Sequence, residues 1–190
     1  MQLWVGLGNP GPGYAMNRHN VGFMVADTLA DVYNFSPIQK KFLGWTQDGR
    51  IGGTRVILLK PATFMNESGR SVGEALRFYK LGTDALTVFH DELDLAPFKV
   101  KVKQGGGTAG HNGLRSIDQH LGADFRRVRL GIGHPGHKDR VTGYVLGNYA
   151  KTELDPLADM LGAVSAEAEW LAKGDDARFM SDVAVRLAGH

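Results

Sequence analysis

The sequence predicts a single α/β domain with a mostly parallel central sheet and helices on both faces. Short apolar runs typical of buried strands alternate with segments of helical periodicity, the pattern of such folds. The 190 residues suit one domain, and no repeat, low-complexity tract or linker divides them. Hydrophobic residues make up 43% and charged residues 22%, which excludes wholesale disorder. We therefore expect one domain over residues 1–190.

The first part of the chain indicates a strand, a helix, a hairpin and a second helix. Residues 3–7 form an apolar run that ends in a glycine-proline cluster, as a buried strand followed by a loop does. Apolar side chains recur at helical spacing over 20–32. Asp48-Gly49 is a turn signal between two strand-like runs. We expect those strands at 42–48 and 53–60, with Pro61 closing the second, and then a helix over 67–80 capped by Asn66 or Ser68.

The second part of the chain continues the alternation. Residues 86–90 indicate a buried strand, and residues 98–103 alternate polar and apolar side chains like a half-exposed strand. A glycine-rich loop at 104–110 follows. The remaining expected elements are a helix over 112–121, a strand over 126–132 and helices over 155–173 and 177–188.

Composition narrows the class of protein. The chain has no cysteine, which excludes disulfides, thiolate metal sites and a cysteine nucleophile. The first residues lack the basic and apolar regions of a signal peptide, and no apolar run approaches the roughly 18 residues of a membrane span. We expect a soluble, cytoplasmic protein with no membrane partner.

Positive charge gathers in one part of the chain. Residues 95–140 carry nine Lys and Arg against three Asp, although the net charge of the whole chain is only +2. Such a block points to a polyanionic partner, and a solvated face is the alternative explanation.

A glycine motif near the N-terminus suggests a dinucleotide site but fits one poorly. Gly6-Leu-Gly8-Asn-Pro-Gly11 matches G-x-G-x-x-G after a predicted strand. Pro10 and Pro12 crowd the turn where a helix would have to begin, and no acidic residue ends a second strand about 20 residues later. We do not expect a nicotinamide or flavin.

Polar residues instead cluster at the ends of the predicted strands, where α/β sheets place their sites. Each asparagine among them has a plainer explanation as a turn or helix-cap residue. Together they could share one rim and one chemistry. The candidates are Asn9, Arg18-His19-Asn20, Asn66, His90-Asp91 and His111-Asn112.

These residue types can hydrolyse an ester without a serine. A histidine titrates near neutral pH and can activate water directly, and a carboxylate such as Asp91 can fix its tautomer. Carboxamides can donate to a carbonyl oxygen that gains charge. Metal catalysis is the competing idea, because residues 90–94 are rich in ligand types, but neighbouring strand residues point to opposite faces and cannot converge on one ion.

Five blocks of sequence stand out together. They are Gly6-Leu-Gly-Asn-Pro-Gly11 with Tyr14 and Arg18-His-Asn20; Lys60-Pro-Ala-Thr-Phe-Met-Asn-Glu-Ser-Gly69; His90-Asp-Glu-Leu-Asp-Leu95; Gly105-Gly-Gly with Gly110-His-Asn-Gly113; and Gly131-Ile-Gly-His-Pro-Gly136. In this order and spacing, up to about residue 149, they resemble the bacterial peptidyl-tRNA hydrolase family. The resemblance implies a metal-independent hydrolase with no cofactor and a single α/β domain built on a twisted mixed sheet. We expect it to act as a monomer. It would cleave the ester between a peptide and the 3′ ribose of tRNA, recycling tRNA from aborted translation.

The resemblance also implies roles for individual residues. His19 matches the family's general base and Asp91 the carboxylate that supports it. Asn9 matches the residue that tells N-blocked from free aminoacyl-tRNA. Tyr14, Phe64, Asn66 and Asn112 match positions lining the substrate site, with Met65 and His111 close by, and Lys101, Lys103 and Arg129 match the basic surface that meets the tRNA.

Departures from the family pattern are few. Asn17 stands where threonine is usual, Ala96 and Phe98 where proline and glycine are often found, and Thr108 and Ala109 vary the loop before Gly110. None removes a proposed catalytic group. A non-catalytic RNA-binding module is the alternative function, but such a module has no need of an imidazole–carboxylate pair.

Overall fold

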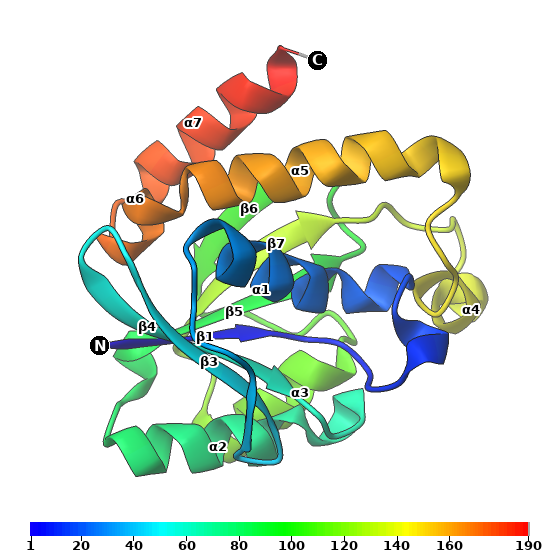
Figure 1. Ribbon diagram of the computed structural model, residues 1–190. Helices are drawn as coiled ribbons and strands as arrows, with labels where there is room; N and C mark the ends of the chain where they lie inside the picture. Colours follow the sequence, from blue (N-terminus) through cyan, green and yellow to red (C-terminus); the bar gives the residue numbers. More distant parts are fainter. Residues whose placement is uncertain (190) are drawn as a thin grey trace.

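The computed structural model describes residues 1–189 and has one seven-stranded mixed sheet (Figure 1). The sheet order is β2-β3-β4-β1-β5-β7-β6. Its four central strands, β4, β1, β5 and β7, run parallel, and the outer neighbours pair antiparallel. The α/β fold with a parallel centre is confirmed. The strands are β1 (Gln2–Gly6), β2 (Gln39–Lys41), β3 (Gly44–Ile51), β4 (Thr54–Pro61), β5 (Leu86–Glu92), β6 (Val100–Gln104) and β7 (Arg126–Gly131).

Helices cover both faces of the sheet, as expected (Figure 1). One face packs against α1 (Val21–Val32), α5 (Leu154–Ala166), α6 (Ala168–Ala172) and α7 (Asp176–Ala188). The other packs against α2 (Ser68–Tyr79) and α3 (Asn112–Leu121). A short helix, α4 (Val141–Val145), lies at the end of the molecule toward which β1 points.

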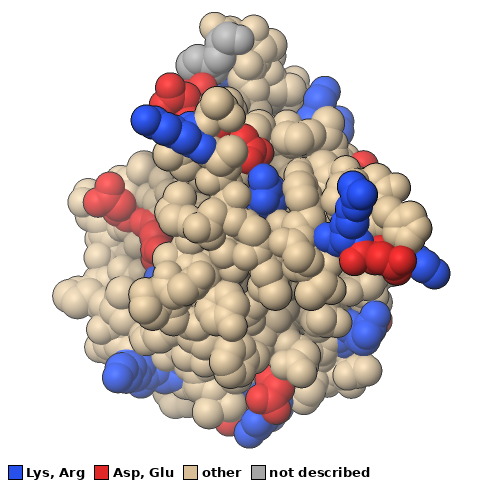
Figure 2. Space-filling model, turned by 90° about the vertical axis from the view of Figure 1, so that its right-hand side faces the viewer, with Lys and Arg blue, Asp and Glu red and all other residues tan. Residues whose placement is uncertain are grey.

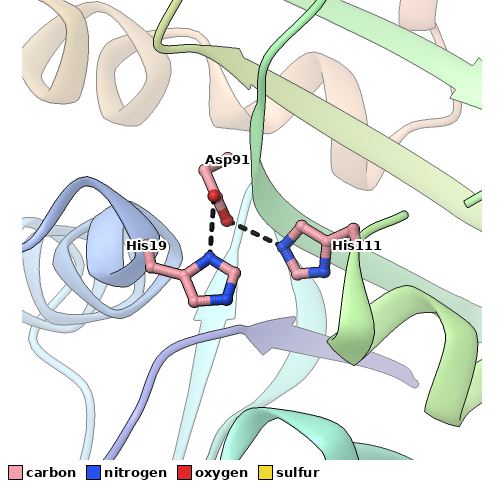
Figure 3. Close-up of side chains that lie close together, drawn as sticks. All are labelled: His19, Asp91 and His111. Atoms are coloured by element: carbon pink, nitrogen blue, oxygen red, sulfur yellow. Dashed lines mark hydrogen bonds and ion pairs between the residues drawn. The ribbon is translucent and has the colours of Figure 1, made fainter. Parts of the chain in front are cut away.

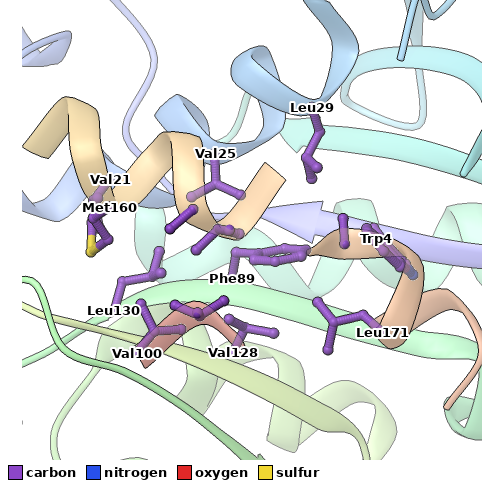
Figure 4. Packing of buried hydrophobic residues seen from close by; sticks show 14 of the residues in the cluster. Trp4, Val21, Val25, Leu29, Phe89, Val100, Val128, Leu130, Met160 and Leu171 are labelled. Atoms are coloured by element: carbon purple, nitrogen blue, oxygen red, sulfur yellow. The ribbon is translucent and has the colours of Figure 1, made fainter. Parts of the chain in front are cut away.

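Alternate residues of β1 build the two hydrophobic cores. Trp4 faces α1 and packs on Phe89 of β5, with ring centroids 5.6 Å apart (Figure 4). Leu3 and Val5 face α2 and α3 on the opposite side. This two-residue alternation explains why a central strand reads as one continuous apolar run.

The β3–β4 hairpin turns four residues later than predicted. Asp48 and Gly49 lie inside the ladder, opposite Ile57 and Val56, and the turn is Gly52-Gly53. Both turn glycines have positive φ, 58° and 82°, which a two-residue hairpin turn of type I′ requires. Gly49 is needed for another reason, because a Cβ there would meet the Phe35 ring at 2.6 Å.

Other boundaries also differ from the prediction. The helix expected over 155–173 is broken at Glu167, whose side chain bonds Trp170 and Arg186. Neither Asn66 nor Ser68 caps α2: a 3-10 turn, Met65–Glu67, leads into it, and Glu67 is the N-cap. The strand expected at 98–103 begins only at Val100, because Phe98 has a φ of 68°.

Two glycines allow α1 to cross the sheet at close range. A Cβ on Gly6 would lie 2.2 Å from the Gly22 carbonyl oxygen, and one on Gly22 would lie 2.4 Å from that of Phe89. The Phe23 amide donates to the Leu7 carbonyl at 3.2 Å and joins helix to strand end. Gly6, the first glycine of the dinucleotide-like motif, thus serves helix–sheet packing, and α1 begins only at Val21, after two 3-10 turns.

Candidate active site

A cavity of about 600 Å³ opens where the parallel strands β1 and β5 end. Figure 2 looks at this end of the molecule, where most of the Lys and Arg side chains lie toward the margins and few charges occupy the centre. The predicted rim exists: polar residues from separate loops line one cleft. They include Asn9, His19, Asn66, Asp91, His111 and Asn112, together with Phe64 and Met65.

Asp91 joins two histidines at the base of the cleft (Figure 3). Its Oδ2 lies 2.8 Å from Nδ1 of His19, and its Oδ1 lies 2.7 Å from Nε2 of His111. The Asp91 side chain is 2% exposed. Both carboxylate oxygens of a buried anion are therefore satisfied by imidazole N–H donors.

Hydrogen bonds fix where the imidazole protons lie. Nδ1 of His111 accepts from the backbone N–H groups of Gly113 and Leu114, so its proton is on Nε2, which donates to Asp91. His19 donates to Asp91 through Nδ1. A neutral His19 therefore has an unprotonated Nε2, as a general base requires.

Electrostatics support the charged form of His19. Burial lowers the pKa of His19, but the charge of Asp91 and its hydrogen bond outweigh burial, and the pKa is raised above its usual value. Burial would raise the pKa of Asp91, but the two histidines hold it well below its usual range. Asp91 therefore stays ionised and can stabilise an imidazolium at His19.

The loop that carries His19 is held against α4 and the segment after it. His19 lies in the 3-10 turn Arg18–Asn20 just before α1. Arg18 bonds Glu153 at 2.9 Å and lies over the Tyr144 ring, with its guanidinium carbon 4.3 Å from the ring centroid. Asn17, one of the departures from the family pattern, donates to Asn148 at 2.8 Å. These contacts tie the turn that carries His19 to the wall of the cleft.

Asn9 presents a donor to the cleft. Its Oδ1 accepts the Met65 amide proton at 2.8 Å, which identifies the oxygen of the carboxamide. Its backbone is held by Asn20, which accepts from the Asn9 amide and donates to the Asn9 carbonyl, both at 2.9 Å. The side-chain atom of Asn9 left for a ligand is Nδ2, which can donate to a carbonyl oxygen.

His90 does not share the role of its neighbour. Its Nδ1 donates to the Asp91 carbonyl oxygen at 2.8 Å. Burial, with His111 next in effect, lowers the pKa of His90 to about 3. His90 is therefore neutral at physiological pH.

The three linked side chains fit a metal ion poorly. One ligand atom of each of His19, Asp91 and His111 lies within 4.8 Å of the others. To bind a metal through Nε2, His111 would have to move its proton to Nδ1, against the two backbone donors that now point at it. The set thus fits a hydrogen-bonded chain of side chains better. The sequence argument considered only residues 90–94 and missed this convergence.

The other predicted site residues divide into two groups. The Tyr14 ring packs edge-on to Phe64, with centroids 6.4 Å apart, and Phe64 is 58% exposed at the rim. Asn112 begins α3, with His111 as its N-cap.

The basic residues lie outside the cleft. Lys101 of β6 pairs opposite Arg129 of β7, with Lys103 two residues further along.

These three cations share one face of the sheet, because directly opposite strand residues and residues two apart point the same way. Lys101 and Lys103 are exposed, and neither has an ion-pair partner among residues 1–189. Arg129 is half-buried, with Nη1 3.8 Å from Glu92 Oε1.

Sequence reasoning missed one wall of the cleft. Val141, Val145 and Leu146 line it from α4 and the residue after it. The only signal was the four-residue spacing of the two valines, which is too short to identify a helix. Of the other departures, Thr108 and Ala109 line the cleft, and Phe98 takes positive φ and stacks on Tyr149 at 6.1 Å.

Comparisons with known proteins agree on one family. The profile described as "Peptidyl-tRNA hydrolase" matches residues 3–188. The chain is 78% identical over 186 residues to the peptidyl-tRNA hydrolase of Novosphingobium aromaticivorans, covering 98% of this chain and 97% of that protein. It is 74% identical to that of Sphingopyxis alaskensis, with both chains fully covered.

A solved structure shows the same fold. The crystal structure of peptidyl-tRNA hydrolase from Acinetobacter baumannii matches with a TM-score of 0.91 and 42% identity, over 96% of this chain and 94% of that one. Within the described chain, no helix is both long and apolar enough to cross a membrane.

Proposed function

The chain belongs to the peptidyl-tRNA hydrolase family and is a peptidyl-tRNA hydrolase, and from this premise we propose that His19 is its general base, supported by Asp91. The bond cleaved is the ester between the peptide, or an N-blocked aminoacyl group, and the 3′ ribose of tRNA. The observation that carries the proposal is the His19 Nδ1–Asp91 Oδ2 hydrogen bond at 2.8 Å, which leaves Nε2 of His19 for water.

The reaction needs one proton to move twice. His19 Nε2 takes a proton from water as the water oxygen attacks the ester carbonyl carbon. The tetrahedral intermediate then collapses, the bond to the ribose oxygen breaks, and the His19 imidazolium returns the proton to that oxygen. Asp91, which stays ionised, stabilises the imidazolium between these steps.

Asn9 would select N-blocked substrates through its donor. A peptide or an acetyl group supplies a carbonyl oxygen next to the ester, and Nδ2 of Asn9 can donate to it. A free aminoacyl group has an ammonium there, which meets a donor and no acceptor. Asn66 and Asn112, with Tyr14, Phe64 and Met65, would line the rest of the substrate site.

Phosphates of the tRNA would lie on the face formed by Lys101, Lys103 and Arg129. The two lysines are exposed and unpaired among residues 1–189, which suits contacts with a flexible backbone of negative charge. A binding module without hydrolysis would use the same face, but would leave the His19–Asp91 pair without purpose. We propose a monomeric, metal-independent enzyme that recycles tRNA in the cytoplasm.

The test compares two substrates that differ by one acetyl group. The protein is incubated with N-acetyl-aminoacyl-tRNA and with the unacetylated form, each with and without EDTA. We expect release of the acyl group from the acetylated substrate, unaffected by EDTA. Equal release from both would refute the selectivity, and loss of activity in EDTA would refute metal independence.

A further inference from the structure

Both ring nitrogens of His111 are engaged within the protein. Nδ1 accepts from the Gly113 and Leu114 amides at 3.1 and 3.3 Å, and so caps the first turn of α3. Nε2 donates to Asp91 at 2.7 Å. The imidazole therefore has no polar atom free for a substrate, although the residue borders the cleft.

We propose that His111 is a positioning residue for the hydrolysis: it fixes Asp91 toward His19 and limits how tightly His19 holds its proton. The inference rests on the proposed function, in which His19 is the base. It gives His111 a role other than contact with the substrate, near whose positions the resemblance places it.

The electrostatic argument concerns the charge of the pair. When His19 is neutral, the buried pair of His19 and Asp91 carries one negative charge, and a hydrogen bond donated to an anion stabilises it. The Nε2–H of His111 is such a donor. Removing it destabilises the anionic pair, so the pair binds a proton more readily and His19 is neutral only at higher pH.

Several other titratable groups lie near the pair, and in one of them, His90, burial and then the charge of His111 lower the pKa. On β5, Nδ1 of His90 donates to the Asp91 carbonyl oxygen, and Glu92 lies at the end of the strand, facing Arg129. Beyond α4, burial and the charge of Asp91 raise the pKa of Tyr149. Arg18, next to His19, is paired with Glu153.

Two substitutions separate capping from positioning. In His111→Asn, the amide oxygen takes the branch position of Nδ1 and can cap α3, because asparagine is among the best N-cap residues. Its side chain ends there, so the donor to Asp91 is lost. His111→Ala loses both contacts. His120→Asn is the matched control, since His120 lies in the last turn of the same helix and its Nδ1 bonds the Ser116 carbonyl, away from the cleft.

The experiment measures the pH dependence of kcat/KM and the NMR titration of the His19 ring in each protein. In the pH profile of kcat/KM, activity falls on the acidic side as His19 becomes protonated, and we call this part of the profile the acidic limb. For both His111 variants we expect the acidic limb and the His19 pKa to move up by about one pH unit, the scale of one charge-assisted hydrogen bond. His111→Ala alone should also lower Tm, by about 2–4 °C for the lost cap. His120→Asn should change neither the limb nor the His19 pKa.

The outcomes distinguish the two proposals. An unchanged or lowered His19 pKa in His111→Asn would overturn the positioning role. A His19 pKa that rises while the acidic limb stays in place would support the contact with Asp91 but refute His19 as the base. A rise of both in step supports both proposals.

Discussion

The cleft and the basic face lie on the same sheet and differ in how closely their side chains are held. In the cleft, Asp91 is buried and both its oxygens have partners within 2.8 Å. On the basic face, Lys101 and Lys103 are exposed and unpaired among residues 1–189. Bond cleavage depends on atoms held within a fraction of an ångström, whereas phosphate binding depends on charge at the right distance. Substitutions in the cleft should therefore lower kcat by large factors, and substitutions of the exposed lysines on the basic face should raise KM by small factors.

The largest expected effect is at the base. His19→Ala should lower kcat by roughly 10²–10⁴-fold with unchanged affinity for tRNA, because water loses its proton acceptor. Asp91→Asn should also lower kcat, since one buried imidazole N–H would then face an amide N–H. Steady-state kinetics and a tRNA-binding measurement on each folded variant test this. Near-normal kcat in His19→Ala would remove His19 from the mechanism.

An intermediate effect is expected at Asn9. Asn9→Asp keeps the acceptor for the Met65 amide but replaces the donor in the cleft by a second acceptor. The ratio of kcat/KM for N-acetyl-aminoacyl-tRNA over aminoacyl-tRNA should fall by about tenfold, the scale of one hydrogen bond to a charged group. Asn9→Ala should also narrow the ratio, with an added loss of stability because the buried Met65 amide loses its partner. An unchanged ratio in both variants would refute the selectivity.

The smallest effects are expected on the basic face. Lys101→Ala or Lys103→Ala should raise KM for full-length peptidyl-tRNA with little change in kcat. Each should also reduce, by about one unit, the slope of the logarithm of the tRNA-binding constant against the logarithm of the salt concentration. A peptidyl-adenosine substrate, which lacks the distant phosphates, should respond to neither change. Lys41→Ala, on β2 at the other edge of the sheet, is the control. If both lysine variants behave like this control, the tRNA face lies elsewhere.

Periodicity predicted the elements better than their contacts. The run at residues 3–7 could be recognised as a central strand because both its faces are buried. The hairpin turn was misplaced because Asp48-Gly49 has a turn composition, whereas Gly49 is required by the Phe35 ring, a contact remote in sequence. The helix also breaks at Glu167, whose side chain bonds Arg186 of α7, and local helical propensity does not reveal such a contact.

Several of the residues that line the cleft could be predicted from the sequence, but their hydrogen-bonded arrangement could not. The residues at strand ends and in the loops that follow indicated Asn9, His19 and Asp91, and the resemblance implied a role for each. The link from Asp91 to His111 could not be foreseen, because histidine is not a preferred N-cap and Asn112 looked the better candidate. The orientation of the Asn9 carboxamide depends on the Met65 amide, 56 residues away.

The close crossing of α1 over the sheet bears on which substitutions the enzyme can accept during evolution. His19 lies three residues before Gly22, whose missing side chain leaves room for the backbones of Leu7 and Phe89. An alanine there would put its methyl carbon 2.4 Å from the Phe89 carbonyl oxygen, so the start of α1 would have to shift, and the His19 turn with it. In a survey of random variants, position 22 should therefore lose activity as a catalytic position does, although glycine contributes no functional group to the reaction.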